Sequence, residues 1–251
     1  MSTFVVKMIA IITMIIDHFG AVFGMPMYFR VIGRVAFPLF VFLIAEGCRH
    51  TKSMEKYILR LGIFALVSEV PFDLAIRGSG LAGVDFLNNT NIFYTLWLGV
   101  VCVYVLQKIK GLIQDKVDMF YNALWLVVPA FVFGAMWLAD WLGTDYGGIG
   151  VLFVFLTAAA AQFDEIKHQK FIQMAVITLF MFVLYFDTFL IEFNLPLDFW
   201  LQHLGNHFLL ASLVAVVVVA FYNGKRGLPV KWLFYVIYPA HLLLFAIVRG
   251  I

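Results

Sequence analysis

The segment FIQMAVITLFMFVLYFDTFL, residues 171–190, decides the fold class of this chain. Its twenty positions hold one charged side chain, Asp187, near the end of the segment. An α-helix rises about 1.5 Å per residue, and the hydrocarbon core of a bilayer is about 30 Å thick. A helix of this length and composition is therefore predicted to cross a membrane once.

Eight further apolar runs are distributed over the rest of the chain. Hydrophobic residues make up 64% of the sequence and charged residues 13%, whereas a soluble domain carries about 25% charged residues. We therefore predict one all-α domain over residues 1–251, a polytopic transmembrane helical bundle of about nine helices in the lipid bilayer. The predicted spans are residues 5–24, 31–48, 55–75, 91–108, 121–140, 146–163, 171–190, 206–222 and 231–248.

The distribution of Lys and Arg between alternate loops predicts the orientation of the bundle. Twelve of these residues fall on the N-terminal side, and four fall on the opposite side. Short cytoplasmic loops are enriched in Lys and Arg. We therefore expect the N-terminus inside the cell and, after nine crossings, the C-terminus outside.

Several function classes are disfavoured by the composition and by the motifs that the sequence lacks. A net charge of +2 is too small to indicate a nucleic-acid partner. The sequence holds no glycine-rich nucleotide motif, no HExxH metal motif and no GxSxG nucleophile motif. Cys48 and Cys102 lie in or beside apolar runs at different depths, so we expect neither a disulfide nor a cysteine metal site.

The first span contains an acid and a histidine side by side, Asp17 and His18. Ionisable side chains in a membrane span are costly and usually face a cavity or a partner, and the helical rise places both residues in the outer half. Histidine has the unperturbed pKa nearest neutrality, which suits a general base. We interpret His18 as a catalytic base and Asp17 as its helper. The alternative is a buried polar pair that packs helices together.

Two pairs of charged residues on the second and third spans are predicted at a similar depth. Arg30 and Arg34 are four positions apart and share one helical face, as do Glu69 and Asp73. All four are candidate substrate-binding residues in one outer cavity with the acid and histidine of the first span. The alternatives are arginines that reach to the membrane interface and a structural ion-pair network. Pro38 is expected to kink or break the second helix.

The last span adds Tyr238 and His241, which are three positions apart on one helical face. The helical rise places His241 near the midplane of the bilayer. We regard it as a second catalytic candidate and Tyr238 as a candidate for binding substrate. A buried histidine with an ordinary hydrogen bond is the alternative.

Both ends of the chain carry a specific set of motifs. They are KMIAIITMIIDH (7–18), RVIGRVAFPLF (30–40), AEG (45–47) with Thr51, Arg60, PFD (71–73), and FY (234–235) with YPAH (238–241). These motifs resemble the TraX family. The likeness covers the first third densely and the last helix, and the middle is similar in hydropathy only.

The resemblance implies an activity and a location. TraX proteins are linked to N-terminal acetylation of pilin, and the family is distantly similar to membrane acyltransferases of the acyltransferase-3 and heparan-glucosaminide acetyltransferase type. Those relatives take an acyl group from acyl-CoA and use a histidine on an early helix, which corresponds to His18 in this chain. The implied location is the bacterial cytoplasmic (inner) membrane.

We therefore expect an acyltransferase that moves an acyl group, first of all acetyl, from cytoplasmic acetyl-CoA to an acceptor at the outer face. The acceptor is an envelope glycan, a lipid or a protein N-terminus. Acyl-CoA acts as a co-substrate, and no metal is expected. Whether the protein forms a homo-oligomer is left open. Basic residues at the inner ends of the helices are predicted to bind the CoA phosphates: Arg49, Lys52, Lys56, Arg60, Lys108 and Lys110.

Two other function classes are compatible with the same residues. The first is a proton-coupled transporter, because acids and histidines in membrane spans also form proton relays. Many transporters have repeated halves and paired broken helices, and neither is visible in this sequence. The second is a non-enzymatic partner in envelope assembly, for which a His18→Ala variant would keep its function.

Overall fold

The computed structural model describes residues 1–78, 80–113, 123–162, 169–193 and 208–250. Over these residues the chain forms helices and no β-strand, which confirms the all-α fold class. The α-helices are α1 (Thr3–Val22), α2 (Tyr28–Gly33), α3 (Ala36–His50), α4 (Met54–Phe72), α5 (Ile92–Ile113), α7 (Val127–Trp141), α8 (Gly147–Gln162), α9 (Gln169–Phe193), α11 (Phe208–Ala220) and α12 (Lys231–Arg249). A π-helical turn (Asp73–Arg77) and two 3-10 turns (Leu81–Gly83 and Leu124–Leu126) complete the regular structure.

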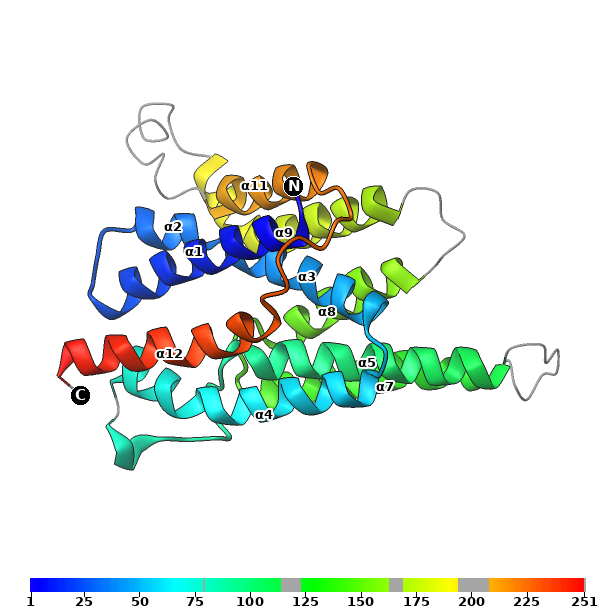
Figure 1. Ribbon diagram of the computed structural model, residues 1–251, viewed down its shortest axis with the longest axis horizontal. Helices are drawn as coiled ribbons and strands as arrows, with labels where there is room; N and C mark the ends of the chain where they lie inside the picture. The colour runs from blue at the N-terminus through cyan, green and yellow to red at the C-terminus, as the bar shows by residue number, and fades with distance from the viewer. Residues whose placement is uncertain (79, 114–122, 163–168, 194–207, 251) are drawn as a thin grey trace.

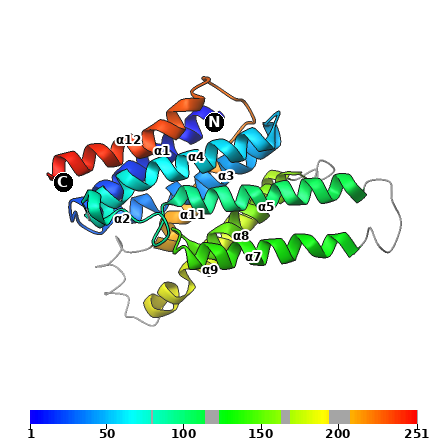
Figure 2. The same ribbon diagram turned by 90° about the horizontal axis from the view of Figure 1, so that it is seen from below.

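The helices form a bundle in which helices that follow one another in the chain alternate in direction. Figures 1 and 2 show the long helices side by side, with their axes close to one common direction. Along it α1, α4 and α12 run one way, and α3 and α5 run the opposite way. Every predicted span contains helix, so the apolar runs in the sequence indicate correctly where helices lie.

Five helical segments are long and apolar enough to cross a membrane, by length and composition. They are Thr3–Val22, Tyr28–His50, Ile92–Ile113, Leu124–Trp141 and Trp232–Arg249. Three further apolar helical segments are shorter, namely Gly147–Gln162, the part of α9 at Gln169–Leu184, and Ala211–Ala220. In addition, α4 contains four charged residues. The chain is thus an integral membrane protein, and nine crossings with the N-terminus inside stay a prediction.

Prolines interrupt the two helices that carry the predicted charged pairs. The second span divides into α2 and α3, and Pro38 lies in the first turn of α3. Pro38 has no N–H to offer the carbonyl of Arg34, so the helix cannot run through unbroken. Pro71 lies near the end of α4, and the chain continues from it into the π-helical turn. Both breaks lie close to the charged residues of the candidate site.

The first and last helices lie together, with α12 packed between α1 and α4. At the N-terminus, the backbone N–H groups of Thr3 and Phe4 donate to the carbonyls of Lys225 and Arg226, at 2.8 and 3.2 Å. These bonds tie the start of α1 to the loop before α12. Large apolar side chains such as Phe133 and Trp137 on α7 are mostly exposed, as expected for a surface that faces lipid.

Candidate functional site

The two histidines predicted as catalytic candidates lie in contact. The rings of His18 on α1 and His241 on α12 lie edge to edge, with their planes at 2° and their centroids 5.0 Å apart. The Nδ1 atom of His18 lies 2.7 Å from the Nε2 atom of His241. The Nδ1 atom of His241 in turn lies 2.7 Å from the carbonyl oxygen of Ile237, one turn earlier on α12. The sequence placed the two histidines on different helices without predicting this contact.

The hydrogen bonds assign the tautomers of both neutral rings. A carbonyl oxygen can only accept, so Nδ1 of His241 carries a proton and donates it to Ile237. Nε2 of His241 must then accept, which requires that Nδ1 of His18 is the donor. The remaining nitrogen, Nε2 of His18, keeps a lone pair and has no hydrogen-bond partner among the described residues. An imidazole in this state can act as a general base.

Tyr238 forms one wall of the histidine pair. Its ring meets those of His18 and His241 edge to face, with both centroid distances 5.7 Å. The residue is buried, and its hydroxyl has no hydrogen-bond partner in the part of the chain that the structure describes. Buried hydroxyls are normally satisfied, so this group is available to a molecule that enters beside the histidines.

Asp17 binds two arginines and makes no contact with the imidazole of His18. Its carboxylate accepts from Arg30 at 2.6 Å and from Arg34 at 2.9 Å. Arg30 also donates to the backbone carbonyl of Asp17, at 3.2 Å. The ion pairs hold α2 against α1, whereas the sequence suggested Asp17 as a helper of His18. Adjacent residues on a helix point about 100° apart, which explains why the two side chains serve different neighbours.

A glycine makes the approach of α2 to Asp17 possible. Gly33 lies between the two arginines, and a Cβ atom at this position would overlap the carboxylate of Asp17. Gly20 on α1 similarly faces Phe29, whose Cβ atom would lie 2.6 Å from an added Cβ. Within the GRV motif at 33–35, Gly33 is therefore required for the close packing of α2 on α1, and Arg34 supplies the charge that binds Asp17.

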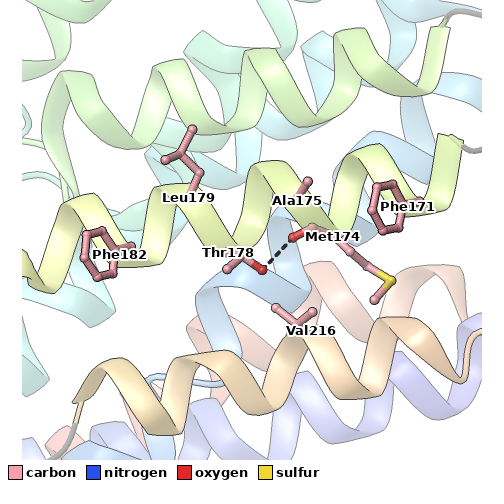
Figure 3. A pocket seen from close by; sticks show the side chains of 7 residues that line it. All are labelled: Phe171, Met174, Ala175, Thr178, Leu179, Phe182 and Val216. Carbon is pink, nitrogen blue, oxygen red and sulfur yellow. Dashed lines mark hydrogen bonds between the residues drawn. The ribbon is translucent and has the colours of Figure 1, made fainter.

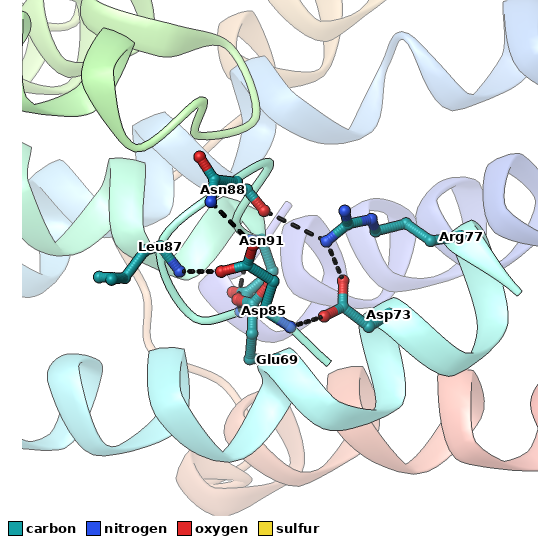
Figure 4. Close-up of polar contacts among 7 residues, drawn as sticks. All are labelled: Glu69, Asp73, Arg77, Asp85, Leu87, Asn88 and Asn91. Atoms are coloured by element: carbon teal, nitrogen blue, oxygen red, sulfur yellow. Dashed lines mark hydrogen bonds and ion pairs between the residues drawn. The ribbon is translucent and has the colours of Figure 1, made fainter. Parts of the chain in front are cut away.

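Glu69 and Asp73 belong to a separate network that anchors the loop before α5 (Figure 4). Asp73 is fully buried and accepts from Arg77 at 3.0 Å and from the backbone N–H of Asp85 at 2.7 Å. One oxygen of Glu69 accepts from the side chain and the backbone N–H of Asn91, at 2.6 and 3.1 Å. Its second oxygen is buried without a partner. The predicted single cavity is thus resolved into two neighbouring clusters.

Asp145, in the loop between α7 and α8, joins the site from a part of the sequence that carried no motif. Its backbone N–H donates to the carbonyl of Thr90 at 3.0 Å, and its carbonyl accepts from Thr95. Tyr146 stacks on Phe37 with centroids 3.6 Å apart, which holds this loop against the start of α3. The Asp145 side chain keeps an open surface.

The electrostatic environment of Asp145 connects it to the arginine cluster. Although the residue is exposed overall, protein atoms around its carboxyl displace part of the water and raise the pKa to about 6, against the effect of the Arg34 charge. The charge of Asp17 adds to the increase. The pattern of apolar and polar residues does not predict that Asp145 lies near the site, because its position depends on how the loop packs.

The basic residues predicted for CoA phosphates lie at the N-terminal end of the bundle in different environments. Arg60 faces the ring of Tyr57, with 5.8 Å to the centroid, and its Nε atom is buried without a partner. Lys108 lies 3.7 Å from Glu55, which neutralises part of its charge. The remaining side chains are exposed at the helix ends: Arg49, Lys52, Lys56 and Lys110.

An apolar groove between α9 and α11 lies apart from these polar clusters (Figure 3). Its single polar side chain, Thr178, bonds to the carbonyl of Met174 at 2.9 Å. The lining offers no ionisable group and hence no acid–base chemistry. Within the described residues, no cluster of three or more His, Cys, Asp or Glu side chains is arranged to hold a metal ion.

Comparisons with known proteins extend over nearly the whole chain. A family model described as TraX protein matches residues 2–249. The chain is 26% identical to "Probable fimbrial assembly protein FimC, serogroup H1" of Dichelobacter nodosus, covering 97% of this chain and 93% of that protein. It is 23% identical to "Uncharacterized protein RP591" of Rickettsia prowazekii, covering 90% and 82%. No solved structure matches the chain.

Proposed function

The chain belongs to the TraX family, and from this membership we propose that it is an acyltransferase embedded in the bacterial cytoplasmic membrane. Cytoplasmic acyl-CoA, in the first instance acetyl-CoA, is the donor. The acceptor lies at the outer face and is an envelope glycan, a lipid or a protein N-terminus. The observation that carries the proposal is the pair of His18 and His241, whose bonds leave one basic nitrogen available within the membrane.

The reaction requires one base and no metal. A hydroxyl or amine of the acceptor attacks the thioester carbonyl carbon, and Nε2 of His18 takes the acceptor's proton as the new C–O or C–N bond forms. The C–S bond then breaks, and the proton passes from His18 to the departing sulfur, so that CoA leaves as the thiol. General-base catalysis of this kind contributes about 10²–10⁴-fold to a rate.

The neighbours of His18 supply orientation and charge. His241 holds the tautomer of His18 and is a positioning residue. Arg30 and Arg34 place positive charge next to the histidine pair, and this charge suits the negative charge that develops on the thioester oxygen. The free hydroxyl of Tyr238 is suited to bind the acceptor.

The donor is proposed to enter from the end of the bundle where basic residues gather. Arg60 has an unpartnered Nε atom within α4, which makes it the strongest of the predicted phosphate ligands. Transfer from a donor at the inner face to an acceptor at the outer face requires a path for the acyl group through the protein. A catalytic histidine between membrane-spanning helices would lie on such a path.

A two-step experiment tests this function. Mass spectrometry of envelope glycans, lipids and surface proteins, with and without the gene, should reveal an acyl mass that is missing from the deletion strain. Complementation with His18→Ala should not restore this mass, whereas complementation with wild type should. Turnover by purified His18→Ala above about a tenth of the wild-type rate is more than loss of a general base permits and would refute the catalytic assignment.

A non-enzymatic role in fimbrial assembly is the second candidate. It is favoured by the name of the Dichelobacter nodosus relative, a probable fimbrial assembly protein. In that case the membrane bundle would act as a docking partner, and the histidine pair would pack α1 against α12. Assembly of surface fibres that proceeds normally with His18→Ala would support this role over acyl transfer.

A further inference from the structure

Two cations, Lys7 and Arg226, meet at the N-terminal end of the bundle. Lys7 lies in the second turn of α1, and Arg226 lies in the loop before α12. The backbone carbonyl of Arg226 accepts from the N–H of Phe4, 3.2 Å away and one turn before Lys7. Gly227 packs closely on Ser2 and Phe4. The docked loop therefore brings the charge of Arg226 within reach of the Lys7 ammonium.

The environment of this pair contains an aromatic ring and no carboxylate that binds either cation. The ammonium of Lys7 lies 4.3 Å from the ring centroid of Phe234, on α12. Among the described residues neither Lys7 nor Arg226 forms a salt bridge. The buried carboxylate of this end, Glu46, is bound to Tyr222 at 2.9 Å and faces His50 at 3.5 Å.

This arrangement differs from an ordinary basic loop. Lys7 is only partly exposed whereas Arg226 is exposed, so water screens the repulsion between the two like charges only in part. Lys108, by contrast, has Glu55 beside it. An uncompensated cation pair of this kind is stabilised when an anion binds between its members, through charge-assisted hydrogen bonds.

We propose that Lys7 and Arg226 form a binding site for a phosphate group. Two sources of that group are chemically equivalent here: the phosphates of a CoA thioester and the headgroup of an anionic phospholipid. The site lies at the foot of α1 and α12, the two helices that carry the histidine pair. His18 is eleven residues beyond Lys7, or about 16 Å along the helix, and His241 is about 10 Å beyond Phe234.

That geometry favours the thioester as the source. A donor held by its phosphates at Lys7 would extend along α1 and α12 with its acyl end toward the histidines. This assignment rests on the proposed acyltransferase function, whereas the phosphate site itself does not.

Binding of acetyl-CoA by the full-length protein in nanodiscs of uncharged phosphatidylcholine tests the donor. The variants are Lys7→Gln, Arg226→Gln and the double variant, with Lys7→Arg as the charge-preserving form. Loss of both cations should weaken binding by about tenfold or more, and Lys7→Arg should retain most of it. S-acetylpantetheine, which has no phosphate, should bind wild type and variants alike. Lys170→Gln removes the same charge at this end and should leave binding unchanged, because Lys170 bonds to backbone carbonyls.

A second arm measures the retention of phosphatidylglycerol by native mass spectrometry. Removal of Lys7 or Arg226 breaks no ion pair, so the variants should stay folded, and thermal unfolding checks this. Unchanged acetyl-CoA affinity with a loss of bound phosphatidylglycerol would identify the lipid headgroup as the source. Unchanged binding of both ligands would overturn the site. Wild type that fails to bind acetyl-CoA would count against the proposed function, and the lipid arm would then decide the site alone.

Discussion

His18 and His241 lie ring to ring, with 2.7 Å between Nδ1 of His18 and Nε2 of His241, although 223 positions separate them in the chain. The contact joins the first helix to the last. It also fixes which nitrogen of His18 is free, because His241 is itself oriented by the carbonyl of Ile237. The chemical state of one residue is thus set by a helix at the opposite end of the sequence.

Replacement of His241 separates positioning from mere packing. In His241→Gln the side-chain oxygen can lie where Nε2 lay and accept from Nδ1–H of His18. In His241→Leu that acceptor is lost, so the His18 tautomer is no longer held. We expect acyl transfer by the Gln variant within about tenfold of wild type and a loss of about 10²-fold or more for the Leu variant.

The pH profile of kcat/KM provides the readout that a packing role would not change. The acid limb reports the free His18 base, and it should move in the Leu variant and stay close to wild type in the Gln variant. Equal losses in both variants with an unchanged profile would show that His241 only packs α12 against α1.

Gly33→Ala should destabilise the protein because the added methyl group would overlap the Asp17 carboxylate. Separation of α1 from α2 would weaken the bonds of Asp17 to Arg30 and Arg34. We expect a loss of about 1–3 kcal/mol, the usual effect of overpacking, seen as a lower thermal midpoint in detergent. The matched control is Gly134→Ala on α7, where an added Cβ meets nothing within 4 Å. That variant should be neutral or slightly more stable, and a similar loss in both would contradict the steric argument.

Asp145 and Asp85 should affect stability in opposite directions as the pH changes. The pKa of Asp145 is raised to about 6, so the folded state binds more protons than the unfolded state between about pH 4 and 6. The contribution of Asp145 to the free energy of unfolding is therefore fully present at low pH and is lost as the pH rises through 6. Asp145→Asn should raise the thermal midpoint relative to wild type at pH 7.5 and not at pH 4.

For Asp85, hydrogen bonds from Asn88 and from the N–H of Leu87 hold the pKa below its ordinary value. Its contribution is present above the unfolded pKa and is lost as the pH falls through the folded pKa. Asp85→Asn should therefore lower the midpoint at pH 7.5 and have less effect at pH 3. Two variants with the same pH dependence would contradict this assignment.

The helices were predictable from sequence because a membrane imposes one strong constraint, a long apolar run for each crossing. The run at 171–190 falls within α9, and Pro38 marks the division between α2 and α3. Finer features were not predictable from the same pattern. Pro71 has no N–H, so a backbone carbonyl near it needs another hydrogen-bond donor. The π-helical turn after Pro71 depends on where that donor comes from, and hydropathy does not predict it.

The candidate site was only partly predictable for a related reason. The cost of charge in a membrane singled out Asp17 and His241, which are buried, and His18, which is half-buried. Equal depth suggested one cavity, but depth does not give the azimuth of a side chain around its helix. Asp73 therefore binds a loop and not the histidines. Asp145 is brought to the site by contacts of a loop, and the helical repeat of apolar residues does not predict such contacts.

The topology of nine crossings yields the last prediction. Helices that follow one another in the chain alternate in direction (Figure 1), and Lys and Arg gather on the N-terminal side, so that side should be cytoplasmic. In a cysteine-free variant, single cysteines at the exposed positions Met25 and Leu87 should react in intact cells with a membrane-impermeant maleimide. Cysteines at the exposed positions Leu112 and Leu228 should react only after the membrane is opened. A cysteine appended to the C-terminus should behave like Met25, since nine is an odd number. Reaction of Leu228 and the C-terminus from the same side would show that α12 does not cross, and would remove one wall of the histidine site from the membrane.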